Sequence, residues 1–412
     1  MTDIEKTGIP FWTADSPPPA QYQWLDHDEG CDVAVIGAGV AGTLCAMRFA
    51  EAGVNTVLLA ESAVGYGATA AAPGVISYQL DGGLLGLSKS IGMDGAVKVF
   101  ELCAQAVDDL DDLCASLPDT SPDDIGFSRR DCFYYTTREA AAESMQREYL
   151  ARRHNGFAVE LLDSQAAEEL FSFPVVSGIH SLGMAAQCDP YALCHAVAAA
   201  AKEHGARIYE HTRVTNVHPD DGKLCLHTAM GKTILASKVI LAAGIEDARH
   251  LGSLAYDRTA FTLTTAPVAG IAGWHAGAVL VSDGCPPIRL RTTPDQRIII
   301  SGLDCGLPNL GMLSGLVPQE MLADKKYREL ECILTEMFPA IHELQAEYCF
   351  RYSYSATPDS LPVIGEMGGS GIYYALCTGE NGIAFANLAA GMLLAHYQGQ
   401  PDPDMALFSP AR

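Results

Sequence analysis

Three glycines near the start of the chain have the spacing of a turn that binds a dinucleotide. Gly37, Gly39 and Gly42 form a G-x-G-x-x-G pattern between an apolar segment at 33–36 and a helical pattern at 40–52. The first glycine allows a tight turn, the second lets the backbone approach a pyrophosphate, and the third lets helix and strand pack closely. The types and spacing of these residues therefore predict a phosphate-binding turn.

The helix that follows the turn begins at Val40, and Ala41 is its second residue. Its first N–H groups lack partners within the helix and its dipole is positive at this end, so a pyrophosphate is favoured there. A second apolar segment at 56–59 completes a strand–helix–strand unit, which is the context that gives the glycine pattern its meaning. The unit predicts binding of a dinucleotide.

The acidic residue that usually completes such a site is displaced by one position. It normally stands at the tip of the second strand, where it binds the ribose hydroxyls. Counting 23 residues on from Gly37 gives Ala60, and Glu61 follows it. One step along a regular strand turns a side chain to the opposite face. We expect Glu61 to reach the ribose only if the chain curls back at the end of the strand.

Apolar periodicity predicts helices and strands along the rest of the chain. Helical patterns cover 88–115, 138–153, 190–204 and 318–338, and strand patterns cover 206–244 and 261–306. The segment 371–399 has the pattern of a strand, a glycine loop and a helix. Nucleotide-type units thus stand at both ends of the chain, so the nucleotide-binding domain is expected to combine distant segments.

Composition excludes several classes of partner. The 412 residues include 50 acidic and 26 basic residues, a formal net charge of -24. Nucleic acids and anionic membrane surfaces bind clustered Lys and Arg, so neither is expected as a partner. We find no apolar run long enough for a membrane span and no apolar signal segment at the N-terminus, so we expect a cytoplasmic protein whose 13 cysteines are reduced.

The sequence shows no pattern with the usual spacing of metal ligands. It contains no C-x-x-C pair and no H-E-x-x-H, and its 12 histidines are scattered. We therefore expect no metal site.

Four separated motifs carry a resemblance to one family of flavoproteins. They are GAGVAG at 37–42, GYGAT at 65–69 with AAAPGV after it, HTRVTNV at 211–217 with ILAAG at 240–244, and SATPDSLPVIGE at 355–366 with CTGENGIAF at 377–385. In this order the chain resembles the D-amino-acid oxidase, glycine oxidase and sarcosine oxidase superfamily of FAD-dependent oxidoreductases. The resemblance runs from about residue 11 to the C-terminus.

The resemblance implies which residues contact FAD. The GYGAT segment is expected to wrap the pyrophosphate and the ring edge, and the valine backbone of HTRVTNV to pair with adenine. The last glycine-rich turn is expected to open a helix whose N-terminus points at the flavin pyrimidine ring, where reduced flavin carries negative charge. The expected cofactor-binding residues are Gly37, Gly39, Val40, Ala41, Gly42, Glu61, Gly67, Ala68, Thr69, Val214, Ala243, Gly244, Asp359, Gly379, Asn381, Gly382 and Ile383.

Patterns and resemblance together predict an α/β fold. It consists of a discontinuous Rossmann-like FAD-binding domain and an inserted α+β substrate domain built on an antiparallel sheet. The expected boundaries are 1–30 for an N-terminal arm, 31–88, 176–248 and 350–412 for the FAD-binding domain, and 89–175 and 249–349 for the substrate domain.

The resemblance implies oxidation of a substrate C–N bond. A small amine or amino acid would lie over the flavin and pass its alpha hydrogen to N5 as a hydride equivalent, and the resulting imine would hydrolyse. The flavin would be reoxidised by O2, and the protein would supply orientation and a dry pocket. The chain lacks a G-D-A-x-H-like segment of the kind that aromatic hydroxylases carry, which argues against oxygen insertion.

Candidate substrate contacts lie on two predicted strands. In EYCFRYSYSATPD, Tyr352 and Tyr354 alternate onto one face, and in IRLRTT, Arg289 and Arg291 are placed to meet a carboxylate. We predict Tyr352, Tyr354 and Arg291 as the catalytic-site residues. The open alternatives are that the tyrosines are ordinary half-buried strand residues and that the arginines lie at the surface or in ion pairs.

Departures from the family pattern leave the chemistry of the electron acceptor open. Amino-acid-oxidising relatives commonly carry an arginine where this chain has Tyr354, and sarcosine oxidases attach flavin through a cysteine where it has Tyr352. We therefore expect noncovalent FAD. No lysine matches the oxygen-activating lysine of sarcosine oxidases, so a dehydrogenase that uses a quinone or a carrier protein is an alternative.

Two further features bear on the branch of the family. The N-terminal arm and the segment SIGMDGAVKVFEL at 90–102 are most similar to the gamma-glutamylputrescine oxidase branch, whose members oxidise amines. The alanines at 70–72 stand where relatives often have polar residues. Together with the displaced ribose acid, they leave a catalytically degenerate flavin-fold binding protein as a third alternative.

Overall fold

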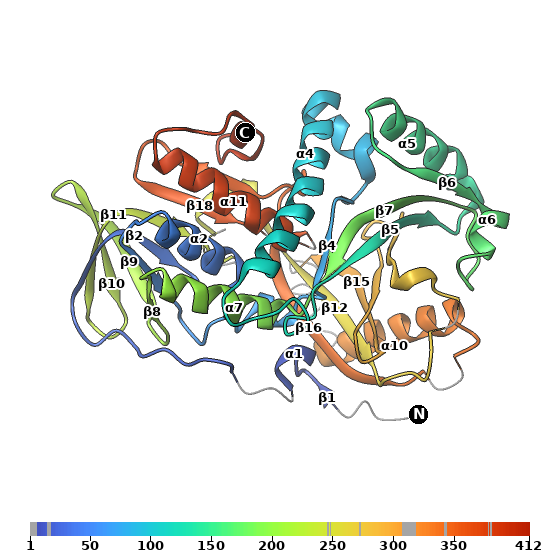
Figure 1. Ribbon diagram of the computed structural model, residues 1–412, viewed down its shortest axis with the longest axis horizontal. Helices are drawn as coiled ribbons and strands as arrows, with labels where there is room; N and C mark the ends of the chain where they lie inside the picture. Colours follow the sequence, from blue (N-terminus) through green and yellow to red (C-terminus); the bar gives the residue numbers. More distant parts are fainter. Residues whose placement is uncertain are drawn as a thin grey trace.

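Two sheets lie side by side in the computed structural model of the chain (Figure 1). The structure describes residues 6–14, 18–244, 247, 249–271, 273–306, 319–341, 344–377, 379 and 381–412. Within these residues, eight strands form one sheet, the small sheet, and ten strands form the other, the large sheet. This arrangement confirms the predicted α/β fold with a Rossmann-like unit and a second unit built on a sheet.

The centre of the small sheet is parallel. Its strands follow the order β18-β11-β2-β3-β8, and each neighbouring pair is parallel. The bounds are β2 Glu29–Ile36, β3 Thr56–Leu59, β8 Arg207–Tyr209, β11 Thr233–Leu241 and β18 Ile372–Leu376. Ile36 pairs with Leu59, so the two strands predicted around the glycine pattern end at the same edge. Every residue of β3 is buried, as expected for a parallel strand covered on both faces.

Antiparallel strands extend the small sheet at its margins. β17 Val363–Glu366 pairs with β18 at one edge. β9 Val214–Asp220 and β10 Lys223–Thr228 form a hairpin that joins the sheet through the pairing of β10 with β11. In Figure 1 this hairpin lies at the far left, away from the large sheet.

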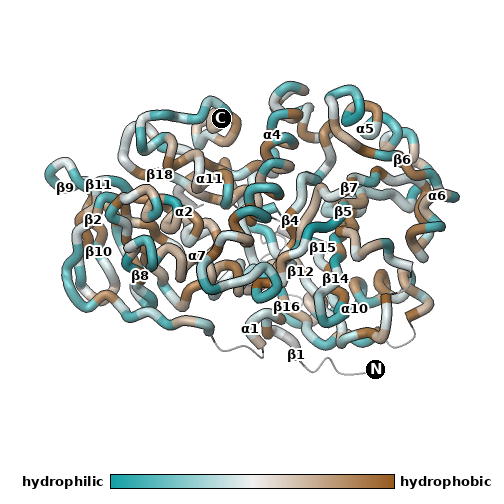
Figure 2. The backbone as a smooth tube through the Cα atoms, in the orientation of Figure 1, coloured by the Kyte–Doolittle hydropathy of each residue, from teal (hydrophilic) through white to brown (hydrophobic). Residues whose placement is uncertain are grey.

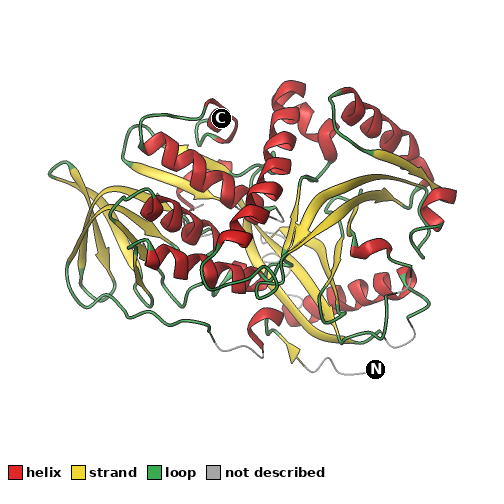
Figure 3. Cartoon of the chain, viewed as in Figure 1, coloured by secondary structure: helices red, strands yellow, loops and turns green. Residues whose placement is uncertain are grey.

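Three helices pack on one face of the small sheet (Figure 3). They are α2 Val40–Glu51, α7 Pro190–Glu203 and α11 Gly382–Tyr397, and α2 lies in contact with both of the others. α2 is buried on nearly all sides, which is why its sequence is apolar with little periodicity. α7 begins at Pro190, where the helical pattern of the sequence begins, and the carboxylate of Asp189 caps it by accepting the N–H groups of Tyr191 and Ala192 at 2.8 and 3.0 Å.

The large sheet is mostly antiparallel, as predicted for the substrate domain. Its order is β1-β16-β12-β15-β14-β13-β5-β7-β4, with β6 paired to β7. Two of its pairs, β1 with β16 and β13 with β5, are parallel. The bounds are β1 Lys6–Thr7, β4 Val75–Ser77, β5 Ser128–Thr136, β6 Glu160–Asp163, β7 Ser177–Gln187, β12 Tyr256–Thr265, β13 Val279–Ser282, β14 Arg289–Thr292, β15 Ile298–Gly306 and β16 Ala346–Ala356.

Three longer helices accompany the large sheet. They are α4 Gly83–Ser116, which kinks at Gly92, α5 Ala142–His154 and α10 Gln319–Met337. α10 packs on β12 through one buried stripe, because Ala323, Tyr327, Leu330 and Leu334 recur at helical spacing. The predicted helices at 88–115, 138–153 and 318–338 correspond to these elements, except that residue 318 lies outside the described residues.

The shorter elements connect these layers. They are α1 Phe11–Ala14, α3 Ala68–Ala71, α6 Ser164–Glu168, η1 Glu139–Ala141, η2 Arg249–Leu254, η3 His275–Gly277 and η4 Pro403–Phe408. Figure 2 shows apolar segments gathered where helices meet sheets, and hydrophilic segments at the outer turns. The largest buried apolar cluster runs from α2 and α11 through α4 into the large sheet, so the two sheets share a core.

Strand pairing changes the assignment of several segments to domains. β4, β7 and β16 belong to the large sheet, whereas the sequence boundaries put β4, all of β7 and part of β16 in the FAD-binding domain. We therefore propose to assign all three strands to the substrate domain. The first strand of the small sheet begins at Glu29, inside the expected N-terminal arm. Residues 6–7 of the arm form β1, which pairs with β16 of the large sheet. Farther along the arm, the N–H groups of Tyr22 and Leu25 donate to the side chains of Glu210 and Thr212, directly after β8 of the small sheet.

Among the helices of the described segments, none combines the length and the hydropathy that a membrane span requires.

Candidate functional site

A cavity of about 370 Å³ lies where the strands of the small sheet end. Gly37, Ala60, Ala242 and Cys377 directly follow the carboxyl ends of β2, β3, β11 and β18, and all four line the cavity. Open α/β sheets bind ligands at this edge. The full lining is 37–41, 60–63, 65–69, 72–75, 242–244, 352–355, 377, 379, 382 and 383.

Most of the predicted site residues come together in this lining. The predicted cofactor residues present are Gly37, Gly39, Val40, Ala41, Glu61, Gly67, Ala68, Thr69, Ala243, Gly244, Gly379, Gly382 and Ile383. Tyr352 and Tyr354, which were predicted to contact the substrate, are also present. Segments separated by more than 300 residues therefore meet around one cavity, although each residue's contact with FAD stays a prediction.

The glycine turn is too tight for side chains. Gly37 has φ +103°, and a Cβ placed there would lie 2.6 Å from backbone atoms of Ala242 and Ala243. A Cβ on Gly42 would lie 1.7 Å from the carbonyl oxygen of Gly37. Gly42 is outside the lining, so its position fits the helix–strand packing predicted for the third glycine. The wall at this point is bare backbone, which is what close approach of a pyrophosphate requires.

The start of α2 is joined to the GYGAT segment. Gly39, at the N-cap position of α2, offers no side-chain cap. Instead, the hydroxyl of Thr69 accepts the N–H of Val40 at 3.1 Å. The first turn of a helix leaves N–H groups without intrahelical partners, and such groups bind phosphate. The two motifs thus form one continuous wall of the cavity, and binding of a phosphate there stays a prediction.

The start of α11 faces the cavity from the other side. Gly382 and Ile383, its first residues, line the cavity. Asn381 precedes them without capping the helix, and its side-chain amide donates to the carbonyls of Ser77 and Gln79 at 3.2 and 3.0 Å. Asn381 therefore ties the helix start to the strand end of β4 and lies outside the cavity lining. The predicted orientation of the helix N-terminus toward the site agrees with this placement.

Ala60 and Glu61 both line the cavity. Ala60 continues the backbone pairing of β3 with the segment that contains β8. Its N–H donates to the carbonyl of Tyr209, and its carbonyl accepts the N–H of Thr212. The chain bends after Ala60, and the Glu61 side chain is about half exposed, with its carboxylate 3.5 Å from Nε of Arg213. The backbone thus bends at the strand end, as a contact between Glu61 and the ribose would require. The ribose contact itself stays a prediction.

Val214 and Asp359 lie outside the cavity lining. Val214 is the first residue of β9 and packs against the apolar cluster on the other side of the small sheet. The carboxylate of Asp359 binds the guanidinium of Arg412 at 2.8 and 3.1 Å and accepts the N–H of Leu361. Burial alone would raise the pKa of Asp359, but Arg412 outweighs it and holds that pKa below the usual value. Asp359 therefore fastens its own loop, between β16 and β17, to the C-terminal residue Arg412.

Arg291 does not occupy the place predicted for it. Its side chain is fully buried, and its Nη1 donates to the carbonyls of Gly74 and Cys188 at 2.7 and 2.6 Å. The ring of Trp12 lies against the guanidinium, 5.1 Å from centroid to Cζ. The prediction that Arg291 meets a substrate carboxylate is therefore corrected: the residue fastens the Gly74 turn, which itself lines the cavity. Every residue of β14 is buried, so no alternation in the sequence could show what Arg291 contacts.

The neighbouring arginine, Arg289, lines a second hollow of about 50 Å³. This hollow shares Tyr354 and Gly379 with the main cavity, so the two spaces adjoin. Arg289 pairs with Asp81, and Tyr354 donates its hydroxyl hydrogen to Asp304. The rings of Tyr352 and Tyr354 lie 5.9 Å apart, as expected for residues on one face of β16.

Two atoms beside the second hollow carry unmet hydrogen-bonding capacity. Nε of Arg258 and Oδ1 of Asp304 are buried and have no hydrogen-bond partner among the described residues. Burial raises the pKa of Asp304, while the hydrogen bond from Tyr354 opposes this shift. A buried donor and a buried acceptor side by side suit a ligand that carries both an anionic and a cationic group.

Sequence reasoning named Arg289, Tyr354, Gly379 and Asn381 but missed the other charged residues in and beside the second hollow. Asp81, Arg258 and Asp304 come from three separate segments, and no local pattern distinguishes them from surface charges. It also missed the contribution of Tyr66, which lines the main cavity although it is 62% exposed. The AAAPGV segment gave a usable signal, because its Ala72, Pro73 and Gly74 all line the cavity.

Comparison with known proteins identifies related sequences and folds. The family described as DAO, FAD dependent oxidoreductase, matches residues 32–397. Glycine oxidase of Geobacillus kaustophilus is 25% identical over 396 residues, which is 92% of this chain and 97% of that protein. Gamma-glutamylputrescine oxidoreductase of Escherichia coli is 27% identical over 242 residues, covering 57% of this chain and 53% of that protein.

Solved structures show the same fold. The crystal structure of the Geobacillus kaustophilus glycine oxidase superimposes with a TM-score of 0.75 at 20% identity, covering 93% of this chain and 99% of that chain. L-proline dehydrogenase from P. horikoshii superimposes with a TM-score of 0.74 at 18% identity, covering 93% and 98%. At these identities the superpositions show the fold alone.

Proposed function

Because this chain belongs to the DAO family of FAD-dependent oxidoreductases, we propose that it oxidises the C–N bond of an amino acid or amine to an imine, which water hydrolyses. When bound, FAD supplies a two-electron acceptor that takes the hydride equivalent at N5 and returns the electrons to O2. The observation that carries the proposal is the bare glycine-lined cavity adjoining a hollow with opposite charges.

The residues of the cavity fit FAD. The turn at Gly37 leaves backbone exposed where a Cβ would collide, and the start of α2 presents N–H groups to the same space. These two features suit a pyrophosphate. The start of α11 suits the negative charge of a reduced isoalloxazine ring, because Gly382 and Ile383 line the cavity at the positive end of the helix dipole.

Tyr352 and Tyr354 would position the substrate and exclude water. Both line the wall that the main cavity shares with β16, and Tyr354 also lines the second hollow. Tyr354 is held in place by its hydrogen bond to Asp304. A fixed aromatic wall orients a small substrate and keeps the imine from premature hydrolysis.

The charges of the second hollow favour an amino-acid-type substrate over a simple amine. Nε of Arg258 offers a donor for a carboxylate, and Oδ1 of Asp304 offers an acceptor for an ammonium or amine N–H. The two residues are already in contact, since Nη2 of Arg258 donates to the backbone carbonyl of Asp304 at 3.2 Å. A charged hydrogen bond is worth about 1.5–3 kcal/mol, so this pair is expected to discriminate by about tenfold or more.

The experiment compares matched substrates that differ only in the carboxylate. The holoenzyme is mixed without oxygen with sarcosine or dimethylamine, glycine or methylamine, and alanine or ethylamine, and bleaching of the flavin bands is followed. We expect at least one amino acid to bleach the flavin, and about tenfold faster than its matched amine. Absence of flavin bands in the purified protein, or no bleaching by any amine or amino acid in a wider panel, would refute the function.

A pair of variants tests the role of Arg258. Arg258→Met is expected to slow reduction by the amino acid and to leave the matched amine almost unaffected. The control, Arg147→Met, removes an exposed arginine on α5 and is expected to leave both rates unchanged. An amine that reduces the wild-type protein faster than the amino acid would reject the carboxylate preference while leaving C–N oxidation intact.

The rate at which oxygen reoxidises the reduced flavin distinguishes an oxidase from a dehydrogenase. The reduced protein is expected to recolour within the time of one turnover when oxygen is admitted. Slow recolouring in air with fast recolouring by a quinone analogue would favour the dehydrogenase alternative. Flavin that is bound and never reduced by any substrate would favour the binding-protein alternative suggested by the alanines at 70–72.

A further inference from the structure

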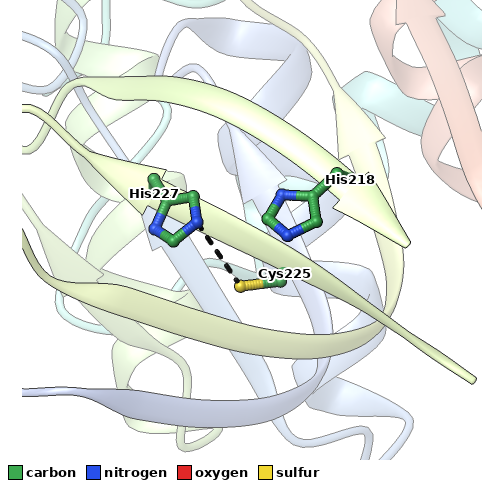
Figure 4. Close-up of side chains that lie close together, drawn as sticks. All are labelled: His218, Cys225 and His227. Atoms are coloured by element: carbon green, nitrogen blue, oxygen red, sulfur yellow. Dashed lines mark hydrogen bonds between the residues drawn. The ribbon is translucent and has the colours of Figure 1, made fainter. Parts of the chain in front are cut away.

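The β9–β10 hairpin brings together three side chains that ligate metals in other proteins. His218, Cys225 and His227 offer two imidazoles and one thiol, and their ligand atoms all lie within 4.8 Å of one another. Figure 4 shows the two rings side by side with the sulfur close to both. The expectation of no metal site considered only spacing along the sequence, whereas the fold brings these three residues together.

Strand register explains the convergence. His218 on β9 pairs directly with Cys225 on β10, and His227 follows Cys225 by two residues on the same strand. Direct partners and residues two apart share one face of a sheet, so all three side chains leave the same face. Leu224 and Leu226, which alternate with them, are buried in the apolar cluster on the opposite face.

The geometry suits a small, borderline-soft cation. The sulfur of Cys225 is 4.0 Å from Nε2 of His227, and the two imidazole rings are nearly parallel at 5.1 Å between centroids. In a tetrahedral zinc site with bonds of about 2.0–2.3 Å, ligand atoms are about 3.5 Å apart, so side-chain movements of about 1 Å close the site.

The three residues also have capacity to bind. Nδ1 of His218 is buried and has no hydrogen-bond partner among the described residues. Leu235 on β11 pairs with Cys225 and covers it on the other flank, so the thiol is only 5% exposed, while His227 is exposed and leaves an approach from solvent. A site with three protein ligands and an open side leaves room for a water as the fourth ligand.

We propose that His218, Cys225 and His227 form a Zn²⁺ site that fastens the β9–β10 hairpin. Thiolate and imidazole are ligands that zinc prefers, whereas Mg²⁺ and Ca²⁺ prefer oxygen. None of the three residues lines the main cavity or the second hollow, so metal binding is separate from substrate oxidation.

A second group, Asp131, His180 and His275, provides a natural internal control. Two of its three residues are already engaged, because Asp131 accepts from the N–H of Gly183 at 2.8 Å and lies 3.1 Å from Nε2 of His180. It offers no thiol. We therefore expect zinc to prefer the hairpin over this group.

The test measures metal binding by the FAD-loaded full chain. Metal-free protein is titrated with Zn²⁺ in excess Mg²⁺, which occupies the many surface carboxylates, and bound zinc is counted after gel filtration. Co²⁺ serves as a second probe, because its d–d bands lie at longer wavelengths than flavin absorption. We expect one tightly bound zinc per chain and cobalt bands of the intensity that tetrahedral coordination with a thiolate gives.

Three variants locate the metal. Cys225→Ser and His227→Ala are each expected to weaken zinc binding at least tenfold and to remove the cobalt bands, whereas His275→Ala leaves both unchanged. His227 is exposed, so its variant is expected to fold and to keep FAD, which far-ultraviolet circular dichroism and flavin absorbance verify. Zinc binding weaker than millimolar in the wild type, equal binding by the hairpin variants, or loss of binding in His275→Ala would each overturn the proposal.

Discussion

Substitution of Gly37 by alanine tests whether the glycine turn holds the nucleotide site open. Gly37 lies at the carboxyl end of β2 with φ +103°, and the Cβ of an alanine would stand 2.6 Å from the backbone of Ala242 and Ala243. Those two residues directly follow the carboxyl end of β11 and line the same cavity. The added methyl group therefore pushes apart two strand ends that together form the cavity wall.

The magnitude follows from two separate costs. Ordinary contact begins at 3.4 Å, so the two strand ends must separate by roughly 0.8 Å, and backbone cannot yield as a flexible side chain can. Overpacking of this kind costs about 1–3 kcal/mol. A left-handed backbone at a non-glycine residue adds about 1–3 kcal/mol. We expect the free energy of unfolding to fall by about 2–6 kcal/mol and FAD affinity to fall more than tenfold.

Two other glycines separate these costs. Gly53, after α2, has φ +77° and open space around the position of a Cβ, so Gly53→Ala adds strain without collision. Gly391, within α11, has neither a positive φ nor a neighbour within 4 Å, so Gly391→Ala is expected to stabilise the helix by up to about 1 kcal/mol. Both variants are expected to retain FAD.

The assay measures flavin absorbance per chain in purified protein, FAD affinity by titration of the apoprotein, and the melting temperature with and without added FAD. Loss of FAD by Gly37→Ala alone, with Gly53→Ala destabilised but loaded, supports the close approach of strand ends as the cause. The reasoning is refuted if Gly37→Ala keeps wild-type flavin content and melting temperature, or if Gly53→Ala loses FAD to the same degree.

Three further substitutions address the ribose, the charged hollow and a helix cap. Glu61→Ala is expected to weaken FAD by about tenfold if Glu61 curls back to the ribose, and an unchanged FAD titration would show that the site works without its acid. Tyr354→Phe removes the hydrogen bond that lowers the pKa of Asp304, so the acid limb of the pH profile for flavin reduction is expected to move to higher pH. Burial raises the pKa of Asp189 to about 6, above its unfolded value, so its stabilising contribution is complete below pH 4 and is lost as pH rises through 6. Asp189→Asn keeps a cap and removes the charge. Between pH 4 and 7, the free energy of unfolding of the variant is therefore expected to rise relative to that of the wild type by up to roughly 3 kcal/mol, which melting curves measure.

The last two predictions have clear contrary outcomes. A pH profile of Tyr354→Phe that coincides with the wild-type profile would show that Asp304 does not titrate in the reaction. A stability difference between Asp189→Asn and the wild type that is constant with pH would show that the Asp189 carboxyl is solvated in the folded chain.

Local patterns in the sequence were sufficient for the elements that hold the nucleotide. The glycine turn, the helix at α2, the capped start of α7 and the strand–helix unit at α11 each depend on residues close together in the sequence, the longest unit running from Ile372 to Tyr397. Turn chemistry, capping and apolar periodicity act over that range, so they can be read from the chain. The order of strands β2 and β3 follows from the same unit.

Only the tertiary structure decided what the charged residues do. Arg291 and Arg289 are two residues apart, yet one is sealed beneath the Gly74 turn and the other pairs with Asp81 beside the cavity. Asp359 holds the C-terminal Arg412, a partner that no local pattern predicts.

The same distinction applies to the metal ligands. His218, Cys225 and His227 have no metal-binding spacing in the sequence, and the register of one hairpin brings them together. A shift of that register by one residue would turn His218 to the opposite face. Local energetics thus determined the cofactor framework, whereas pairing over long distances determined which polar groups meet, because register and burial depend on the whole sheet.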